Sequence, residues 1–138
     1  MFNNDPRELL KILLKKYKLS TDSLSKITGI KNEVILNYAN GEDDDLSSLS
    51  PNNKLDFMDL IMLLTLGMEA ANEDERVYYV IETLTSEFSI STETIALYAN
   101  LEHKEVENFL EDHTSISIEK KYKLGITVLF LHYICKQK

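Results

Sequence analysis

Residues 19–41 read LSTDSLSKITGIKNEVILNYANG, and the serine, glycine and aliphatic positions in this stretch indicate two short helices. Ser20 suits the N-cap of a first short helix, because its hydroxyl can accept a hydrogen bond from a backbone N–H that has no partner inside the helix. Gly29 suits the end of that helix, where a left-handed residue is needed. The pattern therefore predicts one helix over about 21–28 and a second over about 31–40, with a tight turn between them.

The side chains of this stretch indicate how the two helices pack. Ser25 is small, as a residue must be where two short helices cross closely. Ile30 and Ile35 are placed to fill the core, and Val34 and Tyr38 keep the spacing of the same inward face. The polar side chains that begin at residue 31 are then left to face outward.

A second version of the stretch lies further along the chain. A shift of 71 positions places residues 17–24 on 88–95, with Ala96 at the position of Ser25 and Asn100 at that of Gly29. Beyond residue 40 the shift falls to 67, and a surface loop tolerates such a change in length. These matches predict two lobes related by internal duplication, residues 1–70 and 71–138.

Each lobe is predicted to contain four helices, so the expected fold class is all-α. Only 4 Gly and 2 Pro are present, which leaves little material for a turn-rich β architecture. The expected helices cover about 6–17, 21–28, 31–40 and 53–66 in the first lobe, and about 75–88, 92–99, 103–111 and 119–136 in the second.

The fourth helix of each lobe is apolar on nearly all sides, which predicts burial on all sides. One face must pack on the helix's own lobe and the other on something else. Two arrangements stay open: the two fourth helices pair with each other inside one chain, or at least one of them lies in a homodimer interface.

The composition excludes several classes of protein. The 138 residues carry a net charge of −8, one cysteine and three histidines, so neither a disulfide framework nor a structural zinc site is expected. No segment reaches the roughly 18 apolar residues of a membrane span. The first residues lack the basic and apolar segments of a secretory signal. The expectation is a cytoplasmic protein without a membrane partner.

No catalytic, cofactor or metal site is expected, and the protein is not expected to be an enzyme. Cys135 has no visible His–Asn or His–Asp partner pattern, and four glycines do not form a phosphate-binding loop. The acidic run at 42–45 lacks the ligand pattern of a calcium loop and favours a solvated loop. His132 is expected in the core, and four aromatic residues are expected in the core or between the lobes: Tyr78, Tyr79, Tyr98 and Phe109.

Residues 19–41 resemble the helix-turn-helix of regulators of the Cro and phage-repressor type, the lambda-repressor-like kind. The resemblance is carried, in register, by Leu19, Ser20, Leu24, Ser25, Gly29, Ile30, Ile35, Tyr38 and Gly41. In that family the third helix lies in the major groove of double-stranded DNA, with its N-terminal residues on base edges. The resemblance implies that this helix reads DNA through Lys31, Asn32, Glu33, Leu36 and Asn37, and that Thr21 and Lys26 contact flanking phosphates.

The stretch departs from the family pattern at three of these positions. Lys31 replaces the usual Ser or Thr cap of the third helix. Leu36 is apolar where many such proteins carry a polar residue, and the carboxylate of Glu33 repels phosphate.

The charge distribution assigns different roles to the two lobes. Residues 1–41 hold seven basic and four acidic side chains, whereas residues 69–138 hold seven basic and thirteen acidic ones. A negatively charged surface is driven away from DNA. The sequence therefore predicts a transcriptional regulator of phage, plasmid or bacterial type. Lobe one would read DNA, lobe two would serve assembly, and a palindromic operator would require a homodimer.

A second hypothesis uses the same fold without DNA. The third helix of lobe two and its end carry Glu102, Glu105, Glu107, Glu111 and Asp112. This surface favours a protein-interaction module, such as an antirepressor or another inhibitor, that binds its partner through lobe two. A regulator that senses a peptide or a small ligand is a third possibility.

Overall fold

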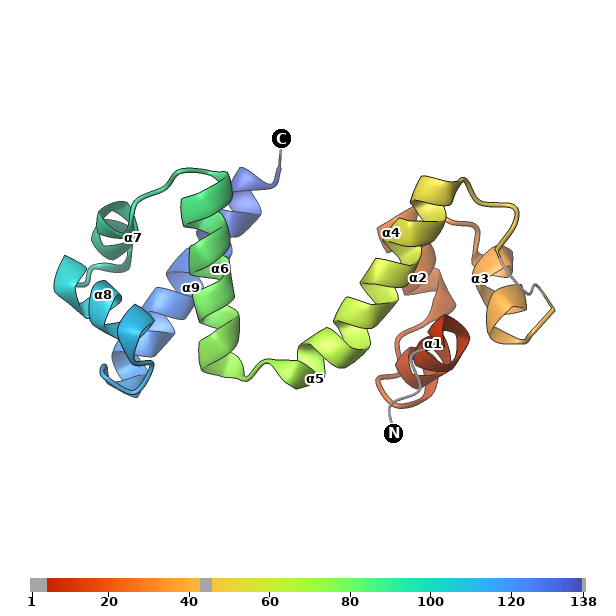
Figure 1. Cartoon of the computed structure of the whole chain (residues 1–138), viewed down its shortest axis with the longest axis horizontal. Coiled ribbons are helices and arrows are strands. Elements are labelled where there is room, and N and C mark those ends of the chain that lie inside the picture. The colour runs from red at the N-terminus through yellow and green to blue at the C-terminus, as the bar shows by residue number, and fades with distance from the viewer. Residues whose placement is uncertain (1–4, 43–45, 138) are drawn as a thin grey trace. The chain divides into compact units, whose positions relative to one another are not determined.

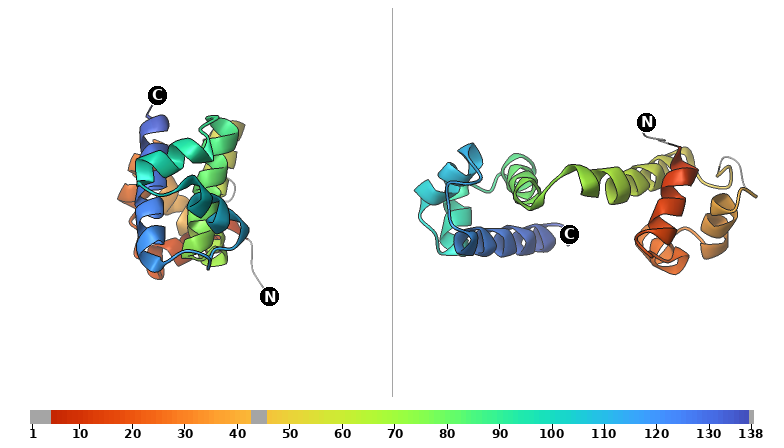
Figure 2. Two further views of the ribbon diagram at one scale, coloured as in Figure 1. Left: turned by 90° about the vertical axis from the view of Figure 1, so that its left-hand side faces the viewer. Right: turned by 90° about the horizontal axis from the view of Figure 1, so that it is seen from below.

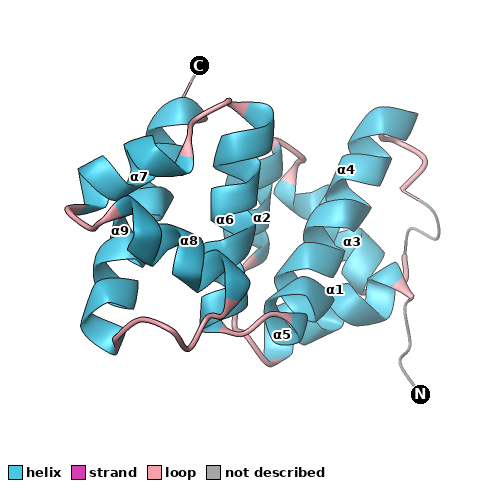
Figure 3. Cartoon of the chain, turned by 60° about the vertical axis from the view of Figure 1, so that its left-hand side comes forward, coloured by secondary structure: helices cyan, strands magenta, loops and turns pink. Residues whose placement is uncertain are grey.

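The computed structural model describes residues 5–42 and 46–137. Regular structure in these residues is helical throughout, which confirms the all-α prediction (Figures 1 and 3). Asp43–Asp45, most of the acidic run considered as a metal loop, lie outside the described residues. The elements are α1 (Pro6–Lys15), α2 (Thr21–Thr28), α3 (Asn32–Ala39), α4 (Pro51–Met62), η1 (Leu63–Gly67), α5 (Met68–Ala70), α6 (Glu73–Glu87), α7 (Thr92–Ala99), α8 (His103–Glu111) and α9 (Ile118–Cys135).

The chain divides into two compact units, Met1–Ala70 and Ala71–Lys138. In unit 1, α1 packs against α3 and α4, and α2 packs against α3. Its core is built from aliphatic residues of these helices together with two aromatic rings. The most deeply buried members are Leu9, Leu10, Leu13, Leu24, Ile35, Phe57 and Ile61 of the helices and Leu46 of the loop before α4, and Tyr38 is buried as well.

Unit 2 repeats this core with different side chains. Helix α9 packs against α6 and α7, and α7 against α8. The buried side chains are Ile81, Leu84, Ile95, Ala96, Val106, Phe109, Leu124 and Val128. Each stands 71 or 67 positions after a residue of the unit 1 set or after Ser25, so the sequence repeat is also a repeat of core positions.

The backbone repeats as well. Lys18 and Ser89, which are 71 positions apart, both have φ of 55°. The next residue in each unit donates its N–H back to the first helix: Leu19 to the carbonyl of Leu13 and Ile90 to that of Leu84, each at 3.0 Å. Serine caps also recur at the starts of α2, α7, α4 and α9. Equal local geometry from different side chains supports an internal duplication.

The fourth helix of unit 1 is longer than predicted. Helix α4 begins at Pro51 rather than near 53 and continues through η1 and α5 as one rod, which Figure 2 shows. Within its own unit each fourth helix is covered on one side only, because Leu55 and Leu63 of the first, and Phe130 and Tyr133 of α9, are exposed. In its described residues each small unit has only three other helices, and these cover one side of its fourth helix.

Of the histidine and aromatic residues considered as candidates, some are buried and others are exposed. Phe109 is buried, but Tyr79 and Tyr98 are exposed, which contradicts a core position for them. His132 is half-buried with its ring edge-on to Phe88. In the part of the chain that the structure describes, no three His, Cys, Asp or Glu side chains gather into a possible metal site. Among the same residues, no helix combines the length and apolar character needed to cross a bilayer.

An exposed ion-pair cluster joins the start and the end of unit 1. The carboxylate of Glu69 accepts hydrogen bonds from the Tyr17 hydroxyl and from Lys16 Nζ, the latter at 2.9 Å. These two bonds lower the pKa of Glu69 below its ordinary value of 4.5. A carboxyl whose pKa is lowered by folding stabilises the fold above its unfolded pKa, and that stabilisation is lost as the pH falls through the folded pKa.

We therefore expect Glu69→Gln to melt at a lower temperature than the wild-type chain near neutral pH. The difference should disappear well below pH 4.5, where both side chains are uncharged. Thermal melts at a series of pH values check this, with Glu87→Gln as a matched loss of one exposed carboxylate. A difference that is independent of pH would show that the charge of Glu69 contributes nothing.

Candidate nucleic-acid interface

Three residues, 29–31, separate α2 from α3, and hydrogen bonds fix the turn that they make. Gly29 has φ of +79° and donates its N–H to the carbonyl of Ser25 at 2.8 Å. The Thr28 hydroxyl accepts from the N–H of Ile30 at 3.1 Å and donates to the carbonyl of Leu24 at 2.6 Å. The turn is therefore held at both ends, which fixes the direction in which α3 leaves α2.

Ser25 performs more than the small-residue role expected from the sequence. Its hydroxyl donates to the carbonyl of Ile30 at 2.6 Å, so it ties the crossing of α2 to the residue just before α3. Ala96, the equivalent residue of unit 2, has no hydroxyl and is buried. The hydrogen bond thus belongs to unit 1 alone of the two repeats.

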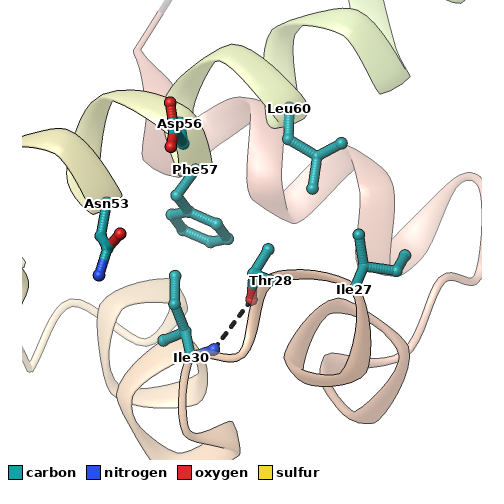
Figure 4. A pocket seen from close by; sticks show the side chains of 7 residues that line it. All are labelled: Ile27, Thr28, Ile30, Asn53, Asp56, Phe57 and Leu60. Atoms are coloured by element: carbon teal, nitrogen blue, oxygen red, sulfur yellow. Dashed lines mark hydrogen bonds between the residues drawn. The ribbon is translucent and has the colours of Figure 1, made fainter. Parts of the chain in front are cut away.

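Helix α4 lies beside the turn and supports it. Figure 4 shows Phe57 of α4 pointing toward the segment from Thr28 to Ile30. The Phe57 ring is buried, while Asn53 and Asp56 stand at the rim of an open hollow of about 300 Å³ beside it. Since Phe57 fills the space between α4 and the turn, the position of α3 depends on the packing of α4.

The outward face of α3 is open to solvent. All five side chains that the resemblance places on bases are exposed: Lys31, Asn32, Glu33, Leu36 and Asn37. Leu36 is 46 % exposed, so it is not part of the core, whereas Ile35 beside it is fully buried. Within the described chain, the side chains of Lys31, Asn32 and Asn37 make no hydrogen bond or ion pair. Helix α3 therefore presents a row of unengaged polar groups.

The N-termini of α3 and α8 differ in a way that bears on anion binding. No side chain caps α3, where Lys31 occupies the N-cap position. In α8 the Glu105 carboxylate accepts from the N–H of Glu102 at 3.1 Å, and it also pairs with Lys120. The hydrogen bond from Lys120 lowers the pKa of Glu105, so the group stays charged. The N–H groups at a helix start attract anions. At the start of α8 the carboxylate of Glu105 already serves as that anion.

Several of the basic residues of unit 1 are engaged inside the unit. Lys26, a predicted phosphate contact, pairs with Asp22 at 3.2 Å across an exposed helix turn, a weak interaction. Lys11 pairs with Glu8, and Lys16 pairs with Glu69. Thr21, the other predicted phosphate contact, is half-buried in the first turn of α2.

Arg7 has a structural role that the sequence did not reveal. Its Nε donates to the carbonyl of Tyr38 at 2.8 Å, and its guanidinium lies 4.7 Å from the centre of the Tyr38 ring. This contact fastens α1 to the end of α3. The two residues are 31 positions apart, and no local pattern pairs them.

Gly29 provides a test of the turn. No atom lies within 4 Å of a Cβ added there, so Gly29→Ala costs only the strain of a positive φ. We expect a loss of about 1 kcal/mol in the free energy of unfolding. Gly29→Asn should recover most of that loss, since Asn100 adopts φ of 57° at the equivalent position. Chemical denaturation checks both variants, and equal losses for Ala and Asn would contradict the backbone explanation.

The geometry of residues 20–39 defines a helix-turn-helix: two short helices, a glycine turn and a supporting core. A family model described as a helix-turn-helix domain matches residues 1–138. The chain therefore belongs to the helix-turn-helix domain family. Comparison with the curated proteins and with the solved structures gave no match.

Proposed function

We propose that the chain is a DNA-binding transcriptional regulator of the Cro and phage-repressor type, in which unit 1 lays α3 in the major groove. The observation that carries the proposal is the solvent-open face of α3, with unengaged Lys31, Asn32 and Asn37 beside an uncapped helix start. Helix N-termini in this motif lie nearest the bases. The residues that must approach DNA most closely are thus the ones that have no partner within the described chain.

Each exposed side chain has a chemical counterpart on DNA. The amides of Asn32 and Asn37 match the paired donor and acceptor of adenine, and Lys31 matches guanine or a phosphate. Leu36 offers the apolar contact that a thymine methyl group accepts. Glu33 is the unfavourable group near phosphate, and it restricts the sequences that α3 accepts. Thr21 and Lys26 contact phosphates that flank the bases. To do so, Lys26 breaks its weak ion pair with Asp22 and binds a phosphate instead.

Unit 2 is proposed to have no role in contacting DNA. Glu102 stands where unit 1 has Lys31, and the carboxylate of Glu105 occupies the start of α8. Both groups repel phosphate. The alternative, that unit 2 binds a protein through this acidic face, has less support, because Glu105 pairs with Lys120 and Glu107 pairs with His103 at 3.1 Å.

A selection from fragmented genomic DNA at low salt tests the proposal. The full chain should enrich duplexes that share a short motif, and its affinity for them should fall as salt is added, because phosphate contacts release counterions. Recovery of no enriched duplex would overturn the proposal. The acidic-face alternative is tested by a pull-down in which Glu107→Lys loses a partner that the wild-type chain captures.

A further inference from the structure

An apolar stripe runs along the outer face of α9. Its members recur every three or four residues, so they share one side of the helix, and all are exposed: Tyr122, Ile126, Leu129, Phe130, Tyr133 and Ile134. Residues 124–135 contain no Asp, Glu, Lys or Arg. Helix α4 differs, because the exposed Asp56 and Asp59 interrupt its apolar residues. The stripe on α9 is therefore the larger charge-free surface of the two fourth helices.

The stripe contains both a projection and a hollow. The rings of Phe130 and Tyr133 stack nearly parallel, at 11° and 6.2 Å between centres, on the exposed side of α9. Beside them is an open hollow of about 370 Å³, lined by Tyr98 of α7 and by Ile126, Phe130 and Ile134. In a two-fold dimer each surface meets its own copy, so a projection next to a hollow can fill the hollow of the partner.

The exposed area fits what a stable dimer needs. The exposed fractions of the six stripe residues and Tyr98 correspond to roughly 800 Å² of accessible surface, close to the share that one partner contributes to a standard interface. The largest apolar patch of a typical monomer is smaller, about 300–600 Å². An area of this size, without charges, resembles the core of a homodimer interface.

We propose that a second copy of this chain covers the stripe, and that the chain is a homodimer held through α9 and Tyr98. Charge placement favours a second copy over a basic partner. Residues 124–135 offer no carboxylate with which a basic partner could pair, and two copies that each carry −8 repel each other least where charge-free surfaces meet. The proposal does not depend on DNA binding.

Sedimentation of the full chain over a range of concentrations tests the proposal. The wild-type chain should sediment as a species of twice its 15.9 kDa. Phe130→Glu should raise the dissociation constant of the dimer about 30-fold or more, as expected for a central aromatic anchor. Added salt should strengthen the wild-type dimer or leave it unchanged, because it screens repulsion and breaks no ion pair at the stripe.

Leu55→Glu is the matched control, since Leu55 is 60 % exposed on α4 and Phe130 is 62 % exposed on α9. It should leave the dimer intact. Both substituted side chains are exposed, and helical circular dichroism verifies that each variant folds. A monomeric wild-type chain, a dimer that persists in Phe130→Glu, or a dimer that dissociates in high salt would each overturn the proposal.

Discussion

Lys31→Glu combined with Asn32→Ala is expected to weaken binding of a selected duplex by about 100-fold or more. Each base contact that is lost contributes about 1–3 kcal/mol, and the new carboxylate adds repulsion from phosphate. Both side chains are exposed and have no partner within the described chain, so the fold should be unaffected. Fluorescence anisotropy at fixed salt measures the change, and thermal melting verifies folding.

The matched control makes a change of equal charge at the start of the corresponding helix of unit 2. Lys104→Glu with His103→Ala alters net charge equally, at the start of α8 rather than at the start of α3. It should leave DNA affinity nearly unchanged. If both double variants lost affinity to the same extent, the effect would come from overall charge, and the role proposed for α3 would be wrong.

Phe57→Ala is expected to destabilise unit 1 by about 3–5 kcal/mol, because it removes a buried ring and leaves a cavity. Phe57 is 1 % exposed, and it lies between α4 and the turn (Figure 4). A domain of about 70 residues is stabilised by only a few kcal/mol, so much of unit 1 should unfold. Hydrogen exchange, read residue by residue, should show lost protection in α1–α4.

The same experiment tests whether residues 1–70 and 71–138 fold independently, which we propose from their separate cores. In Phe57→Ala the amides of α6–α9 should keep their protection. Phe109→Ala, a matched removal of a fully buried ring in unit 2, should give the converse result. Loss of protection throughout the chain in either variant would show that the two units unfold together.

Helix bounds could be predicted where caps are local. The bounds of α2, α7 and α8 agree with the sequence pattern, because Ser20, Ser91 and the residues that end α2 and α7 are recognisable. The start of α4 was predicted two residues late, although Ser50 followed by Pro51 is a readable cap and first-turn signal. The segment η1 is a short π-helix, whose turn is wider than that of an α-helix, and no such local signal predicts it. It coincides with buried Thr65, whose hydroxyl donates to the carbonyl of Ile61 at 2.7 Å.

The sequence predicts which side chains of α3 face outward, but it does not predict the long-range contacts that hold this helix in place. The helical spacing predicts an inward Ile35, which is buried, and the resemblance to Cro-type regulators implies an outward Leu36, which is exposed. The pairing of Lys16 with Glu69 and the clamp of Arg7 on Tyr38 join residues far apart in the chain, and only the packed fold brings them together. The contrast between the starts of α3 and α8 likewise required coordinates, because it depends on the Glu105 carboxylate and Lys120.

The most direct test of the central claim is a map of backbone amide shifts in the full chain as an enriched duplex is added. We expect the largest changes at residues 31–37, with smaller ones near Thr21 and Lys26. The equivalent residues of unit 2, 102–108, should stay unchanged. Changes centred on α8, or no change in α3 while the duplex binds, would contradict the claim that α3 reads DNA.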